Sequence, residues 1–288
     1  MATLEGSYRY HGHRIAYDVH GDGPSTIVLI HGLLMNRRMF DRLAPELASR
    51  GNRAVTIDLL GHGRSDRPVD SRLYSMGAFA DQVLGLLDHL GLEAPVVGGT
   101  SLGANVGLEF ASRYPDRTRG LFIEMPVLDN ALLGAALAFT PMLVALRFGE
   151  GLLRVLAALT NRIPRSNHLL DMALDWMRQE PEPSRAVLEG ILFGRTAPPR
   201  EERRLLEHPA MVIGHPADPL HPFSDADELV EEMPNAHLVD ANSILEWRIS
   251  PRRLDDELAR FLASTHAEPE LAASGAGPRE HGGRSPAP

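Results

Sequence analysis

Short apolar runs that alternate with helical patterns constrain the fold of this chain most strongly. A short, continuous apolar run is typical of a strand that is buried on both faces. Strands that alternate with helices predict a parallel sheet with helices on both faces, an α/β fold. The expected strands are TIVLI (26–30), AVTID (54–58), APVVGG (94–99), GLFIEM (120–125), AMVIG (210–214) and AHLVD (236–240). The expected helices cover 39–50, 76–90, 102–114, 224–232 and 251–263.

The chain opens differently, with two alternating segments, SYRY and RIAYDVH, on either side of His11-Gly12. This pattern predicts an antiparallel hairpin, so the expected sheet has eight strands and is mostly parallel. The strand–helix alternation stops at Pro126 and resumes near residue 206, which predicts an inserted helical cap over 126–205. The core domain is then expected to comprise residues 1–125 and 206–264. The tail, 265–288, is rich in Gly, Pro, Ser and Ala, which predicts disorder.

Composition excludes several classes of site. The 288 residues contain no cysteine, which excludes disulfides, thiolate metal sites and cysteine nucleophiles. The formal net charge of −9 argues against a nucleic-acid partner and against an anionic membrane surface. No metal or organic cofactor is expected, since no ligand cluster or nucleotide motif is present. The N-terminal residues lack an apolar signal-peptide core, so we expect a cytoplasmic protein, of undetermined oligomeric state.

One uncharged stretch, Ala131 to Leu146, invites comparison with a membrane span. It is shorter than the ~18–20 residues that a span requires, and Pro141 is expected to break it. We therefore expect a buried or cleft-lining helix. The arginines that follow, Arg147, Arg154, Arg162 and Arg165, could anchor a carboxylate, but we interpret them as a solvated helix face.

The motif GTSLG, residues 99–103, carries the clearest chemical signal. It stands between an expected strand and an expected helix, where two glycines permit a sharp turn that leaves a serine side chain exposed above the sheet. The following helix directs its free N–H groups and its dipole to the same point. Ser101 is therefore a candidate nucleophile, and the N–H of Leu102 a candidate oxyanion donor.

Together with LIHGLL (29–34) and DLLGHGRSD (58–66), this motif resembles the α/β-hydrolase family over roughly residues 8–263. The resemblance implies that Leu33 supplies a second oxyanion N–H. It implies structural roles for His31 and His62. It also implies that Asp218, which is followed by Leu220 and Pro222, is the catalytic acid, with a plain surface turn as the alternative and Glu124 as a second candidate.

The expected base is missing from its family position. The family histidine follows the last strand, but the segment before Pro251 reads ANSILEWRIS, and residues 238–265 contain no histidine. A relocated histidine must then come from elsewhere. We favour His215 over His221, because His215 begins the loop directly after a strand. His237 and His168 are weaker candidates.

The function that these features favour is hydrolysis of a small apolar carbonyl compound, an ester, a lactone or similar, by Ser101, Asp218 and His215. Because the usual histidine is absent, two alternatives stay open. One is a non-hydrolytic enzyme of the lyase or isomerase type on the same frame, and the other is a ligand-binding protein without turnover.

Overall fold

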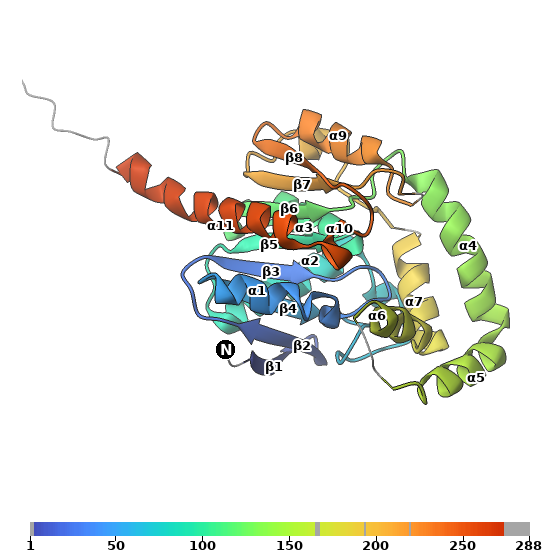
Figure 1. Cartoon of the computed structure of the whole chain (residues 1–288). Helices are drawn as coiled ribbons and strands as arrows, with labels where there is room; N and C mark the ends of the chain where they lie inside the picture. Colours follow the sequence, from blue (N-terminus) through green and yellow to red (C-terminus); the bar gives the residue numbers. More distant parts are fainter. Residues whose placement is uncertain (1–2, 165–167, 193, 219, 274–288) are drawn as a thin grey trace, which may run out of the picture.

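The computed structural model describes residues 3–164, 168–192, 194–218 and 220–273, and it contains an eight-stranded sheet (Figure 1). The strand order is β1-β2-β4-β3-β5-β6-β7-β8. β1 and β2 form the antiparallel hairpin that the sequence predicts, β2 pairs antiparallel with β4, and all other neighbours are parallel. The strands are Thr3–Tyr10, His13–His20, Thr26–Ile30, Arg53–Asp58, Val96–Thr100, Gly120–Glu124, Ala210–Gly214 and Ala236–Asp240.

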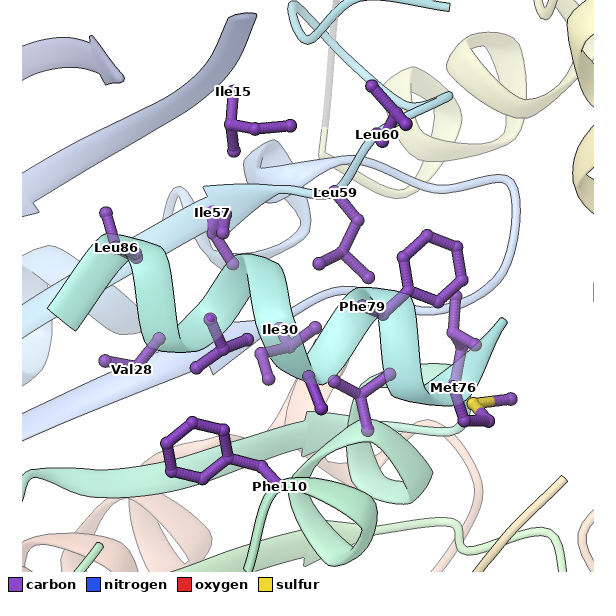
Figure 2. Packing of buried hydrophobic residues seen from close by; sticks show 14 of the residues in the cluster. Ile15, Val28, Ile30, Ile57, Leu59, Leu60, Met76, Phe79, Leu86 and Phe110 are labelled. Atoms are coloured by element: carbon purple, nitrogen blue, oxygen red, sulfur yellow. The ribbon is translucent and has the colours of Figure 1, made fainter. Parts of the chain in front are cut away.

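Helices cover both faces of the sheet. The sequence of β3 is apolar because its side chains are buried on both of these faces. Val28 and Ile30 join one buried cluster, which includes Phe79 and Leu86 of α2 (Figure 2). Ile27 and Leu29 join another, with residues of α1 and α11. The core helices are α1 (Leu43–Ser49), α2 (Met76–Leu90), α3 (Leu102–Arg113), α9 (Phe223–Glu232), α10 (Glu246–Ile249) and α11 (Arg252–Ala273), with 3-10 turns at Arg37–Phe40, Ser71–Leu73 and Pro115–Arg117.

Two predicted helices differ most from the structure in their bounds. The helix expected over 39–50 is a 3-10 turn followed by α1, and Asn36 caps the turn by accepting a hydrogen bond from the Arg38 N–H. The final helix is longer than expected, because α11 continues to Ala273, so residues 265–273 of the predicted disordered tail are helical. The remainder of that tail, 274–288, lies outside the described residues.

The segment between β6 and β7 is helical, and it lies beyond one end of the sheet (Figure 1). Its helices are α4 (Leu132–Phe148), α5 (Glu150–Thr160), α6 (His168–Met177), α7 (Pro181–Leu192) and α8 (Arg200–Arg203). We call α4–α8 the cap. The break expected at Pro141 does not occur, since α4 runs through it. Proline removes the hydrogen bond to the carbonyl four residues earlier, here that of Leu137. Leu137 is exposed, so water can satisfy that carbonyl.

In the part of the chain that the structure describes, no single helix is long and apolar enough to cross a membrane. The pair Leu132–Phe148 and Gly151–Thr160 reaches that length and composition together, but it is bent by 99°. We expected α4 to be either buried or cleft-lining. Its residues line a cavity, which is described below. None of the residues of α4 is buried.

The turn between β5 and α3 depends on a close approach to β3. A Cβ added at Gly99 would lie 1.8 Å from the carbonyl oxygen of Ile30, and one at Gly103 would lie 1.9 Å from the same atom. Both glycines are therefore required by the packing of β5 and α3 against the end of β3. This contact fixes the position of Ser101, which lies between them.

We expect Gly103→Ala to destabilise the protein by at least ~2–3 kcal/mol, because the obstacle is backbone and cannot rotate away. Urea unfolding of the variant and the natural protein measures the difference. Gly151→Ala is the matched control: it lies in α5 with open space around its Cβ position. It should be neutral or slightly stabilising, since alanine favours helix. Equal stability of Gly103→Ala and the natural protein would contradict the role of this contact.

Candidate active site

Ser101 lies at the strained turn that joins β5 to α3. Its φ of 54° and ψ of −111° are unusual for a residue with a side chain. The backbone holds the turn on both sides: the Ser101 N–H donates to the Glu124 carbonyl at 2.8 Å, and the Asn105 N–H donates to the Ser101 carbonyl at 3.1 Å. The serine hydroxyl is thereby presented at the end of the sheet, in the geometry that the motif predicts.

His221 lies within hydrogen-bond distance of this hydroxyl. Its Nε2 is 3.0 Å from Ser101 Oγ, and its Nδ1 is 3.0 Å from Asp218 Oδ2. The imidazole therefore bridges a serine hydroxyl and a carboxylate. A serine, a base and a group that orients the base, in contact in this order, form the arrangement of an activated nucleophile.

One tight turn supplies both the carboxylate and the imidazole. Asp218 Oδ1 accepts hydrogen bonds from the backbone N–H groups of Leu220 (2.8 Å) and His221 (3.0 Å), which fixes the three-residue step between the two side chains. Burial alone would raise the pKa of Asp218, but the hydrogen bond and charge of His221 and the two N–H groups lower it overall. The carboxylate form is therefore favoured beside the imidazole.

The preference for His215 over His221 is not met by the geometry. His215 is buried, with Nε2 3.2 Å from Glu124 Oε1 and Nδ1 3.1 Å from the Ser243 carbonyl. The contact with Glu124 is a close ion pair rather than a well-aligned hydrogen bond. Both ring nitrogens are thus directed at groups other than Ser101. The side chain of His168 lies outside the described residues, and His237 lies in β8.

Glu124, the second candidate for the acid, belongs to this separate cluster. It accepts a hydrogen bond from the Thr100 hydroxyl and lies 3.5 Å from Arg248 Nη1. Burial raises its pKa, but Arg248 and His215 outweigh that effect and lower the pKa to about 2. For His215, burial lowers the pKa, and the Glu124 carboxylate raises it overall. The cluster is a buried pair of opposite charges.

The segment after β8 occupies the place of the missing family histidine. Ser243 binds His215 through its carbonyl, and the Asn242 N–H donates to Glu246 Oε2 at 2.5 Å. Glu246 is in turn bound by Arg253. The segment is therefore anchored to the core through its backbone and through Glu246.

The candidate oxyanion donors lie next to Ser101. Leu102 is the first residue of α3, so its N–H has no acceptor within the helix. The loop after β3 is adjacent, since a Cβ at Gly32 would lie 4.0 Å from the Cβ of Ser101. Leu33 and Leu102 both line the same cavity as Ser101.

His31 and His62 occupy structural positions, in agreement with the sequence. His31 is fully buried; Nδ1 lies 2.8 Å from the Gly32 carbonyl, and Nε2 accepts from the Leu59 N–H at 3.1 Å. His62 Nδ1 lies 2.9 Å from the Leu60 carbonyl, and the two rings are 4.7 Å apart. Burial lowers the pKa of both histidines, so the neutral forms hold the loops in place.

A cavity of about 270 Å³ opens beside Ser101, between core and cap. Among the described residues that line it, none is charged, and its polar members besides Ser101 are Asn105 and Thr196. Asn105 is occupied, since its amide binds the backbone of Val127 and Thr196. The apolar lining consists of Leu33, Met76, Leu102, Val127, Leu132, Ala135, Ala136, Phe139, Leu188, Ile191 and Leu192.

Comparisons with known proteins agree with this fold. Residues 25–166 match the model of the alpha/beta hydrolase fold family. The chain belongs to the α/β-hydrolase fold family. The AB hydrolase superfamily protein YisY of Bacillus subtilis is 27% identical over 74% of this chain and 81% of its own length. The solved enol-lactonase of Burkholderia xenovorans superposes with a TM-score of 0.72 at 20% identity, covering 90% of this chain and all of that chain, which shows the fold alone.

An uncharacterized protein of Mycobacterium tuberculosis is 39% identical over 105 residues, which are 36% of this chain. The chain spans 30% of the length of this relative. Among the described residues, no group of three or more His, Asp or Glu side chains could hold a metal ion.

We expect His215→Gln to lower the free energy of unfolding by about 1–3 kcal/mol near pH 5–6 and by less at high pH. The raised pKa of His215 gives stability that is complete below its ordinary value of 6.5 and is lost as the pH rises through the raised value. The lowered pKa of Glu124 gives stability that is present above 4.5 and is lost as the pH falls toward about 2.

Urea unfolding between pH 4.5 and 9 tests this dependence. His266→Gln, an exposed histidine of α11, is the control, and its stability difference from the natural protein should not vary in this way. A difference for His215→Gln that is constant across the range would show that the charge pair contributes nothing.

Proposed function

We propose that this α/β-hydrolase cleaves small apolar esters or lactones through Ser101, with His221 as general base and Asp218 as the acid that orients it. The observation that carries the proposal is the contact of His221 with both Ser101 Oγ and Asp218 Oδ2. A base within ~3 Å of the proton that it removes meets the geometric requirement of general base catalysis.

In the proposed reaction, Ser101 Oγ attacks the carbonyl carbon while its proton passes to His221 Nε2. The resulting imidazolium is stabilised by Asp218, which stays ionised. The N–H groups of Leu33 and Leu102 bind the oxyanion, and each such donor is typically worth ~3–4 kcal/mol in the transition state. The tetrahedral intermediate collapses, the alcohol leaves with the proton from His221, and water hydrolyses the acyl-serine in the same way.

The cavity supports an apolar substrate. Burying a charged group there would cost several kcal/mol, since the described lining offers no charged partner. A volume of about 270 Å³ is near the lower end of small-molecule pockets. A short aliphatic or single-ring acyl group therefore suits it better than a long chain.

The alternatives to hydrolysis, a lyase or isomerase and a binding protein, were motivated by the missing family histidine. The contact of His221 with Ser101 weakens that motive. No contact of the described residues favours either alternative specifically, so hydrolysis is the better-supported function.

Treatment with a fluorophosphonate probe tests the nucleophile and the base. The natural protein should be labelled, and Ser101→Ala should not. His221→Ala should lower kcat for a p-nitrophenyl ester by at least about 10³-fold, because the serine then loses its proton acceptor. Asp218→Asn should also lower kcat, since the imidazole loses its orienting carboxylate.

The matched control is His237→Gln, an exposed histidine that lies in β8. It should keep full activity. A folded natural protein that is not labelled would overturn the proposal, and so would a folded His221→Ala variant with undiminished activity.

Filling the cavity should change specificity. Ala135 lines the cavity from α4, so Ala135→Phe is expected to lower kcat/KM by at least ten-fold for butyrate or benzoate esters, and by much less for acetate. Ala138→Phe, on the exposed side of the same helix, is the control and should leave the series unchanged. A uniform loss for all esters in Ala135→Phe would show that the acyl group does not enter this cavity.

A further inference from the structure

The outer side of the cap exposes large apolar side chains in regular rows. On α4 the row consists of Leu133, Leu137, Val144 and Phe148, which are 72%, 69%, 51% and 83% exposed. Their spacing of four, seven and four residues places them on one face of a helix. The other face of α4 carries Phe139, Met142, Leu143 and Leu146, which pack against the core.

A second row follows on α5. Leu152, Val155, Leu156 and Leu159 are exposed and have the spacing i, i+3, i+4 and i+7, which also defines one helix face. We call these eight residues of α4 and α5 the outer rows. Single exposed apolar residues are ordinary on a protein surface, but an apolar exposed face on each of two consecutive helices indicates a surface that binds something.

The charge of this region is opposite to that of the whole chain. Residues 131–164 contain three arginines, Arg147, Arg154 and Arg162, and one acidic residue, Glu150, whereas the chain as a whole carries −9. Arg154 forms an ion pair with Glu182 at 3.4 Å, so the excess positive charge of the region comes from Arg147 and Arg162. Exposed leucine and phenylalanine beside arginine are the composition of helices that lie in a membrane interface.

The two helices lie at the periphery of the molecule. α4 and α5 form the outer rim of the cap, on the side away from the sheet (Figure 1). They are bent by 99° relative to each other. The same bend prevents them from crossing a bilayer as one straight helix.

From these observations we propose that the outer rows dock this protein on the surface of an anionic lipid bilayer. The apolar side chains would enter the headgroup region, and Arg147 and Arg162 would pair with lipid phosphates. A second copy of the chain is a poorer occupant, because two copies of a surface of the same positive charge would repel each other. The net charge of −9 argues against an anionic surface for the chain as a whole, but the local charge here is positive.

Vesicle flotation tests the proposal without any substrate, so its outcome is independent of the proposed ester hydrolysis. The natural protein should float with vesicles of phosphatidylcholine and phosphatidylglycerol, and less with phosphatidylcholine alone. Phe148→Glu and Leu137→Glu should each weaken binding at least ten-fold, since each removes an inserted apolar group and adds repulsion. Arg162→Gln should weaken binding to the anionic vesicles by about five-fold, the loss expected for one basic side chain.

Leu205→Glu is the matched control, because Leu205 is 78% exposed but follows α8, outside the outer rows. It should bind as the natural protein does, and circular dichroism should show that all variants are folded. Absence of flotation of the natural protein, or an equal loss in Leu205→Glu, would overturn the proposal. It would also be overturned if the natural protein is a dimer that ignores vesicles and Phe148→Glu is a monomer in light scattering.

Discussion

The contact of two glycines with the end of β3 is the constraint on which the candidate site depends. Gly99 and Gly103 both lie against the Ile30 carbonyl, so β5 and α3 approach β3 more closely than any side chain would allow. Ser101, between them, has no room to turn inward and takes a strained backbone conformation. The same close approach brings the loop after β3 beside the serine, where Leu33 and Leu102 face a common cavity. Packing of the core and presentation of the nucleophile thus have one origin.

Two pairs of an acidic residue and a histidine lie at the same end of the sheet. Their surroundings differ, and each pair suits a different role. His215 and Glu124 are both almost fully buried and close to Arg248. A pair in that setting holds a loop together, since moving either charge would leave the other unpaired. His221 and Asp218 lie in a turn, and the imidazole retains 15% exposure and a free path to Ser101. A base must gain and lose a proton with its surroundings, so the less buried pair is the one suited to catalysis.

The fold was predictable because its signals are local. Apolar runs, glycines at the turn and the hairpin pattern each specify a few neighbouring residues, and the strands they predict are confirmed almost to the residue. Helix ends were less accurate where capping and tertiary contacts decide them, as at Asn36 and Ala273. Pro141 is a further example of a tertiary effect. The free energy that it costs α4 depends on whether Leu137 is exposed, and the sequence does not reveal that exposure.

The base was harder to predict. The choice between His215 and His221 depends on where each side chain points, and the two residues lie only a few positions apart in one loop. His215 follows directly from β7 and its side chain turns toward Glu124, whereas the turn begun by Asp218 rotates His221 toward the serine. A local signal was present: an aspartate whose side chain can accept the N–H groups two and three residues later commonly forms such a turn. That pattern, DPLH, links the acid to His221 and not to His215.

The cap helix α4 connects the site to the molecular surface. Its inner face lines the cavity with Leu132, Ala135, Ala136 and Phe139, and its outer face carries exposed leucine, valine and phenylalanine. A helix that is apolar on all sides is stable only where both faces are covered. The core covers one face of α4, and a lipid surface would cover the other. An apolar substrate dissolved in that surface would then lie one helix diameter, about 10 Å, from the cavity beside Ser101. On this view the composition of α4 serves the cavity and the surface together, which explains why the helix has no polar face.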